Sequence, residues 1–266
     1  MSKYNFRSHL EMSERYEELK AAGNYGKLYL LDLSTESDQR LLFCGSRHTS
    51  DPKDLQYQEM EELFKEFLIS KNPKKIVMSE GQVRAVEEMT LDEAILNHGD
   101  PGFTCWMALN HKIELISPEP DTGKEIAILV EKFGAAKTAL YYFARQMHQW
   151  ARSDFKVRPD WQEYAECLLK SYSSFFPNFT MTIESLSDIF KQETGKVFSW
   201  AEIDTLYKIS CPIPESVASR CSQFRDEFIF EAIEKHWNKG YDIFIVYGSG
   251  HAIVQEPALV KLCGGG

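Results

Sequence analysis

Short apolar runs recur along the chain, and each is followed at once by a polar turn. They occupy residues 41–44, 76–78, 113–116 and 243–247. Three of the four are nearly continuous rather than alternating, as in strands whose two faces are both covered by helices. The pattern therefore predicts an α/β fold with a mixed, largely parallel sheet that has helices on both faces. The mixed character comes from residues 27–33 and 40–44, which flank a turn-rich stretch and favour an antiparallel hairpin.

Helical periodicity fills the segments between these strands. The segments with helical character are residues 54–68, 91–96, 103–109, 125–152, 160–172 and 224–237. In the last segment the apolar positions expected on one face are Phe224, Phe228, Ala232, Ile233 and Trp237. The longest segment contains Gly134, which weakens it as a helix.

The region before the last strand is helical and contains no predicted strand. Two short helices are expected near residues 183–192 and 200–207, on either side of a turn at 194–196. We therefore interpret the chain as a single α/β domain over residues 1–266, with a helical insertion at 125–214. The insertion either caps the site or only thickens the molecule.

Composition and charge narrow the class of protein. The chain has 266 residues, 43% of them hydrophobic and 26% charged, and a formal net charge of −10. Because binding to nucleic acid or to an anionic membrane normally needs a cationic stripe, we expect neither partner. The apolar stretches run to about five residues, far short of the ~20 that a membrane helix needs. The six cysteines are scattered, and the N-terminus has no hydrophobic leader, so we expect a cytoplasmic protein.

Four polar turns that follow the strands carry the candidate chemistry. They supply His48, Glu80, Glu119 and His251, and both histidines end a Gly-x-x-His turn. Because the carboxyl ends of parallel strands share one edge of the sheet, these side chains are expected to meet there. We expect the glycines to let the chain turn sharply in front of each histidine.

Two kinds of chemistry fit this set of residues. His48, Glu80 and His251 match the ligands of a divalent metal site for Zn, Mn or Co, where the ion would activate water. Without a metal, the same groups and Glu119 could act as general acid and base. Simpler roles are open too, since Glu80 could accept hydrogen bonds from a helix N-terminus and Glu119 could belong to a rigid surface turn. The sequence contains no Walker loop, Gly-x-Gly-x-x-Gly motif or Gly-x-Ser-x-Gly elbow, so we expect no nucleotide cofactor.

The order of these motifs resembles one known superfamily. The chain resembles the superfamily of TraB/PrgY, Tiki, ChaN-like and erythromycin esterase-like proteins. The motifs that carry this resemblance are the two Gly-x-x-His turns at His48 and His251, the strand end at Glu80, Pro118-Glu119-Pro120 and Arg225-Asp226. The resemblance covers about residues 27–260 and implies the fold of that superfamily. It also implies a site around His48, Glu80 and His251, with Arg225 on the preceding helix. An arginine there could stabilise an oxyanion or bind a carboxylate, or could form an ordinary ion pair.

Members of this superfamily differ in chemistry, so the resemblance leaves several functions open. The first hypothesis is a hydrolase that acts on an ester, amide or peptide, either metal-dependent or with histidine-activated water. In it Glu119 is a second acid or base and Arg225 the electrophilic helper. The second is a non-catalytic protein that binds a metal, haem or a small anion, and the third is an interaction domain on the same fold. The substrate is expected to be a small molecule or a peptide, and the sequence leaves open whether the chain forms a homo-oligomer.

Overall fold

The computed structural model describes residues 3–36, 38–152, 160–198 and 216–264. The chain divides into two compact units, which are described separately below. The first comprises Met1–Glu119 and Arg225–Gly266, and the second comprises Pro120–Phe224. Among the described residues, no helix combines the length and the apolar character needed to cross a bilayer.

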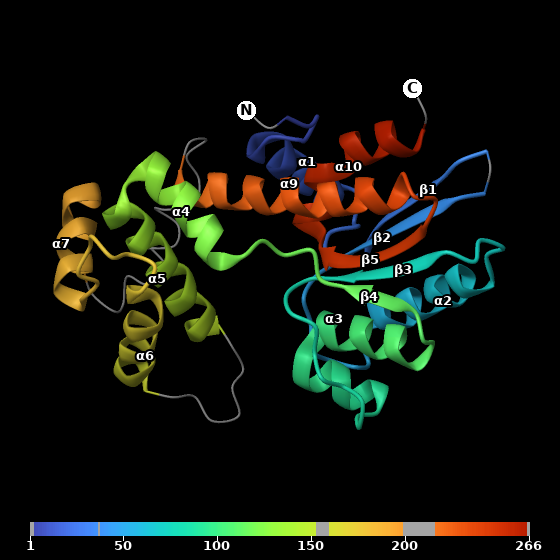
Figure 1. The fold of residues 1–266 in the computed structure, drawn as a ribbon, viewed down its shortest axis with the longest axis horizontal. Coiled ribbons are helices and arrows are strands. Elements are labelled where there is room, and N and C mark those ends of the chain that lie inside the picture. The colour runs from blue at the N-terminus through green and yellow to red at the C-terminus, as the bar shows by residue number, and fades with distance from the viewer. Residues whose placement is uncertain (1–2, 37, 153–159, 199–215, 265–266) are drawn as a thin grey trace. The chain divides into compact units, whose positions relative to one another are not determined.

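A five-stranded sheet forms the centre of the first unit (Figure 1). Its strands are β1 (Tyr29–Ser34), β2 (Arg40–Ser46), β3 (Lys75–Ser79), β4 (Glu114–Ile116) and β5 (Asp242–Gly248). The spatial order is β1-β2-β5-β3-β4, with β1 antiparallel to β2 and all other neighbours parallel. The prediction of an α/β fold with a mixed, mostly parallel sheet is therefore confirmed.

Helices cover both faces of this sheet (Figure 1). One face is covered by α2 (Leu55–Ile69) and α3 (Leu91–Asn110), and the other by α9 (Val217–Trp237) and α10 (Ser249–Cys263). A further helix, α1 (His9–Ala21), packs on α10. Burial of apolar side chains on both faces explains why the strands are continuous apolar runs.

Side chains of the central strand β5 pack in the apolar cores on both faces of the sheet. Ile243 and Ile245 belong to the apolar cluster on the α9 and α10 face, whereas Phe244 and Val246 belong to the cluster on the α2 and α3 face. All four side chains are fully buried or nearly so. Successive strand side chains point to opposite faces, so every position of this strand contributes to a core.

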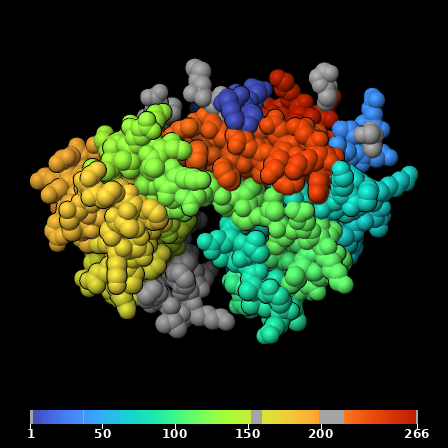
Figure 2. Space-filling model, in the orientation of Figure 1, coloured from blue at the N-terminus to red at the C-terminus, as the bar shows by residue number. Residues whose placement is uncertain are grey.

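Helix α9 buries only part of the face expected from the sequence, since Ile233 and Trp237 pack in the core as predicted. The sequence pattern places Phe228 on the apolar face, but its side chain is 39% exposed. The residues that pack on the sheet are Ile229, Phe230, Ile233 and Trp237, which lie at helical spacing from one another. The outer face of α9 lies at the surface, shown in orange in Figure 2.

Two helix boundaries also differ from the sequence prediction. The segments 91–96 and 103–109 are joined in α3, which is broken by a non-helical Gly99 (φ 60°, ψ −138°) just before Pro101. Proline is tolerated there because the first turn of a helix leaves its N–H groups unpaired in any case. The turn expected at residues 248–251 is instead the start of α10, whose buried apolar residues continue to Cys263.

The second unit is helical. It contains α4 (Thr122–Phe133), α5 (Ala135–Arg152), α6 (Trp161–Ser173) and α7 (Ile183–Thr194). The stretch predicted as one helix over 125–152 is two helices, because Gly134 adopts φ 84° between them. The helix expected at 200–207 lies outside the described residues.

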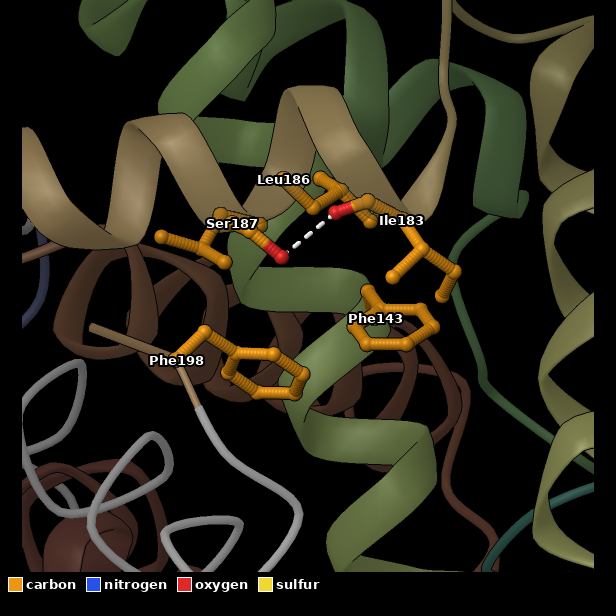
Figure 3. A pocket seen from close by; sticks show the side chains of 6 residues that line it. Phe143, Ile183, Leu186, Ser187 and Phe198 are labelled. Carbon is orange, nitrogen blue, oxygen red and sulfur yellow. Dashed lines mark hydrogen bonds between the residues drawn. The ribbon is translucent and has the colours of Figure 1, made fainter.

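The helices of the second unit enclose an apolar core and one narrow crevice. Figure 3 shows the crevice, which is lined by Leu140, Phe143, Ile183, Leu186, Ser187 and Phe198. The hydroxyl of Ser187 donates to the carbonyl of Ile183 (2.7 Å), so the only polar side chain of the lining is already bonded. The crevice has no room for a water-sized sphere, and we therefore regard it as a packing gap rather than a ligand pocket.

Candidate active site

The carboxyl ends of four strands meet at one edge of the sheet in the first unit. Ser46 at the end of β2 pairs with Gly248 at the end of β5, and Ser79 of β3 pairs with Val246. The residues that follow these strands carry the side chains expected from the sequence. The structure brings all five together, namely His48, Glu80, Glu119, Arg225 and His251.

His48 is fixed by its backbone and by one buried partner. It adopts φ 53° in the left-handed region, and its Nδ1 lies 2.9 Å from Oδ2 of Asp100. The side chain is 57% exposed, and its other nitrogen, Nε2, lies 3.6 Å from Oε2 of Glu80. Asp100 itself is only 3% exposed.

The glycines of the two Gly-x-x-His motifs have a role other than the one expected. Neither Gly45 nor Gly248 has a positive φ, so the prediction that they permit sharp turns is wrong. Both allow close approach instead. A Cβ on Gly248 would lie 2.4 Å from Nε2 of His48. A Cβ on Gly45 would lie 2.9 Å from the carbonyl oxygen of Tyr29 and 3.0 Å from Cα of Ser249.

Asp100 is the centre of a buried hydrogen-bond network. Its Oδ2 accepts from Ser46 Oγ (2.6 Å), while its Oδ1 accepts from Tyr57 OH (2.9 Å) and Gln56 Nε2 (3.4 Å). These donors fix the position of the carboxylate beside His48. The hydrogen bond to Asp100 raises the pKa of His48 above its ordinary value, with a further contribution from the charge of Glu80 and against the effect of burial.

His251 has a similar arrangement in a more buried place. It lies in the first turn of α10, and its Nδ1 is 2.7 Å from Oδ1 of Asp226 on α9. Gln255 donates to the same oxygen (2.8 Å), and the His251 side chain is 15% exposed. Burial lowers the pKa of His251, but the charge and hydrogen bond of Asp226 and the charge of Glu80 outweigh it, so the pKa is raised.

Glu80 lies between the two imidazoles. Its Oε2 is 3.6 Å from Nε2 of His48, and its Oε1 is 3.9 Å from Nε2 of His251. Oε2 also accepts a hydrogen bond from the backbone N–H of Gly248 (2.8 Å), at the N-terminus of α10. Burial opposes the charge of Glu80, but the two histidines, Arg225 and this N–H together lower its pKa.

Glu119 and Arg225 form a two-pronged ion pair beside Glu80. The guanidinium donates from Nη2 to Oε1 (3.0 Å) and from Nε to Oε2 (3.1 Å) of Glu119, and its Nη2 lies 3.4 Å from Oε1 of Glu80. Glu119 Oε1 also accepts from the N–H of Gly81 (3.1 Å). The ordinary roles considered for Glu80 and Arg225, a helix N-terminus and an ion pair, are thus present within the same cluster.

Two members of the cluster were not assigned a role from the sequence. Asp226 stands beside Arg225 in a motif, but that motif does not indicate contact with His251. Asp100 gave no signal beyond its position before Pro101, where aspartate is a common start of a helix. Its contact with His48 depends on the break at Gly99, a feature of the tertiary structure.

The charges of this cluster do not balance. The cluster contains the carboxylates of Glu80, Asp100, Glu119 and Asp226 and the guanidinium of Arg225, which together carry −3 while the two imidazoles are neutral. Such an excess favours protons on the two imidazoles, in line with their raised pKa values. It would equally favour a bound cation.

A metal ion is one such cation, and the donor types suit it. Imidazole Nε2 atoms whose Nδ1 atoms are held by carboxylates are typical of zinc sites. In the part of the chain that the structure describes, however, no three histidine, cysteine or acidic side chains are arranged to hold an ion. Both oxygens of Glu80 face N–H donors, from Gly248 and Arg225, so this arrangement does not fit a metal without a rearrangement.

Comparison with known proteins adds no further information about this site. The chain matches no protein-family model, no curated protein and no solved structure.

Proposed function

We propose that the protein is a hydrolase of esters, amides or peptides in which His48 activates water as a general base. The observation that carries this proposal is the Asp100–His48 pair at the strand edge. If Nδ1–H of His48 donates to Asp100 (2.9 Å), then the lone pair is at Nε2, on an imidazole that is 57% exposed. An imidazole whose orientation is fixed and whose Nε2 carries the lone pair can remove a proton from water.

The reaction follows from this tautomer. As the water oxygen attacks the substrate carbonyl carbon, Nε2 of His48 takes one of its protons, and the carbonyl π electrons move to the oxygen. When the tetrahedral intermediate collapses, the bond to the alkoxy or amino group breaks, and the imidazolium returns the proton to the departing group. The products are a carboxylic acid and an alcohol or amine, and the histidine is neutral again.

The neighbouring charges assist this cycle. Glu80, 3.6 Å from Nε2 of His48, stabilises the imidazolium that forms after proton transfer. Glu119 and Arg225 keep Glu80 in place through their shared ion pair. We assign His251, held by Asp226, the role of a second positive partner for Glu80 when it is protonated.

The superfamily of TraB/PrgY, Tiki, ChaN-like and erythromycin esterase-like proteins remains our proposal for the fold family. It is supported by the position of His48, Glu80 and His251 at adjacent strand ends. The metal-dependent variant, with Zn, Mn or Co held by His48, Glu80 and His251, remains a prediction. A bound ion would supply an activated water.

The proposal is tested by turnover of ester and peptide substrates. The purified protein should hydrolyse members of a panel of 4-nitrophenyl esters and fluorogenic peptides over many cycles. His48→Ala and Glu80→Gln should reduce the rate by about 10²–10⁴, whereas His9→Ala on α1, away from this cluster, serves as a matched control. Retained activity in a folded His48→Ala variant would refute the role of His48.

Elemental analysis of the same preparations separates the two chemical routes. Stoichiometric metal that is lost in the double His48→Ala, His251→Ala variant would favour the metal-dependent route. Binding of a metal, haem or a small anion without turnover of any substrate would instead favour the non-catalytic alternative.

A further inference from the structure

A second arginine lies at the same strand edge as Arg225, on the loop that follows Glu80. Arg84 packs over the turn after β3, with its Nη2 3.7 Å from the position that a Cβ on Gly81 would occupy. The N–H of Gly81 donates to Glu119, so this guanidinium adjoins the site through a single residue.

Among the described residues, no carboxylate forms an ion pair with Arg84. Within the described ranges, no acidic oxygen lies within 4.0 Å of its nitrogens, and its Nε is buried without a hydrogen-bond partner. Arg225, by contrast, shares its charge between Glu119 and Glu80. A guanidinium without a carboxylate partner beside the site can pair with an anionic group of a ligand.

The loop that carries Arg84 is held in place by α3. The backbone N–H of Arg84 donates to Sγ of Cys105 (3.3 Å), and Val86 is buried in a cluster with Cys105. Further along, the carbonyl of Met89 accepts from Nε1 of Trp106 (2.9 Å). A guanidinium on an anchored loop loses little backbone freedom when it binds a ligand.

We propose that Arg84 is a substrate-anchoring residue that binds a carboxylate group of the substrate at the rim of the site. A guanidinium can donate two Nη–H groups to the two oxygens of a carboxylate, and no acidic side chain among the described residues competes for those of Arg84. This inference depends on the proposed function for its meaning, because it names the substrate class as an ester, amide or peptide that also bears a carboxylate.

The test measures binding rather than turnover, so its outcome is independent of the hydrolase proposal. Dissociation constants for the full chain are obtained by NMR titration with N-acetyl-L-alanine and with its neutral amide, N-acetyl-L-alaninamide. The native protein should bind the carboxylate about tenfold or more tightly than the amide, because a charge-assisted hydrogen bond is lost in the amide. Arg84→Gln should abolish this preference, and Arg84→Lys should retain part of it.

Arg15→Gln is the matched control for this comparison. Arg15 also has a buried Nε without a partner, but it lies on α1, and Glu18 meets its charge. The control should keep the native preference for the carboxylate. Undetectable or equal binding of the two probes by the native protein, or a preference that survives in Arg84→Gln, would overturn the proposal.

Propionate and propionamide identify the source of the carboxylate. If propionate binds as tightly as N-acetyl-L-alanine, the group recognised is a carboxylate of any small molecule. If only N-acetyl-L-alanine binds, it is the C-terminus of a peptide. Carboxylate binding through Arg84 without hydrolysis of any substrate would refute the proposed function and leave this inference intact.

Discussion

Replacement of Asp100 by asparagine tests the central contact of the site. The four donors around this carboxylate constrain how asparagine can fit. Gln56 Oε1 accepts the N–H of Arg47 (3.2 Å), which fixes the amide so that its Nε2 faces Oδ1 of Asp100. The asparagine oxygen is therefore favoured on that side, and its NH₂ group faces His48.

This orientation reverses the tautomer of His48. An NH₂ group opposite Nδ1 can only donate, so the imidazole carries its proton on Nε2 and loses the lone pair that activates water. General-base catalysis contributes about 10²–10⁴ in rate, and we expect kcat/KM to fall by that factor. The free energy of unfolding should fall by about 1–3 kcal/mol, because one charge-assisted hydrogen bond in a buried network is lost.

Two measurements check this reasoning. Long-range ¹H–¹⁵N NMR spectra of the imidazole report the tautomer of His48 and the direction in which its pKa moves, which should be downward. Asp226→Asn is the companion variant, and it should affect His251 in the same spectra while the signals of His48 keep their native tautomer. A folded Asp100→Asn protein with an unchanged tautomer and a native rate would refute the argument.

Three further predictions concern the same cluster. Gly248→Ala should displace His48, because the added Cβ would lie 2.4 Å from its Nε2. The variant should have lower activity, while circular dichroism shows a native fold. Native activity in this variant would contradict the close approach of Gly248 to His48. The raised pKa values of His48 and His251 stabilise the folded protein below about pH 6.5, and this stabilisation is lost as the pH rises through their folded-state pKa values. The lowered pKa of Glu80 stabilises the folded protein above about pH 4.5, and this stabilisation is lost as the pH falls through its folded-state pKa. Urea denaturation across this range should show both losses, and a flat alkaline side would be inconsistent with the histidine contacts. Glu119→Gln should reduce the free energy of unfolding by about 1–3 kcal/mol, since it weakens a largely buried two-pronged ion pair, and an unchanged urea midpoint would argue against that pair.

The sequence pattern was sufficient to predict the strands and their shared edge. Each strand is a short apolar run with a polar residue directly after it, and parallel pairing then brings those residues together regardless of their separation in sequence. For this reason His48 and His251 could be expected as neighbours. The hairpin, the mixed sheet and most helices followed from the same periodicity.

Contacts that arise from packing could not be predicted in this way. Asp100 reaches His48 only because α3 is broken at Gly99, and no periodicity encodes that break. The buried face of α9 was predicted only in part for a related reason, since Ile233 and Trp237 are buried but Phe228, which matches the same helical pattern, is 39% exposed. The close approach of Gly248 to His48 likewise depends on how two strands are placed, which the glycine alone does not specify.

The position of β5 has a consequence for the assembly of the protein. It is the last strand in the sequence, yet it lies between β2 and β3, which do not pair with each other. During synthesis both of those strands are made long before their partner, and they carry unpaired backbone edges while the helical unit is translated. The protein therefore cannot close its sheet, or bring His251 to Glu80, until residues 242–251 have left the ribosome, and until then the unpaired edges of β2 and β3 can pair with other chains.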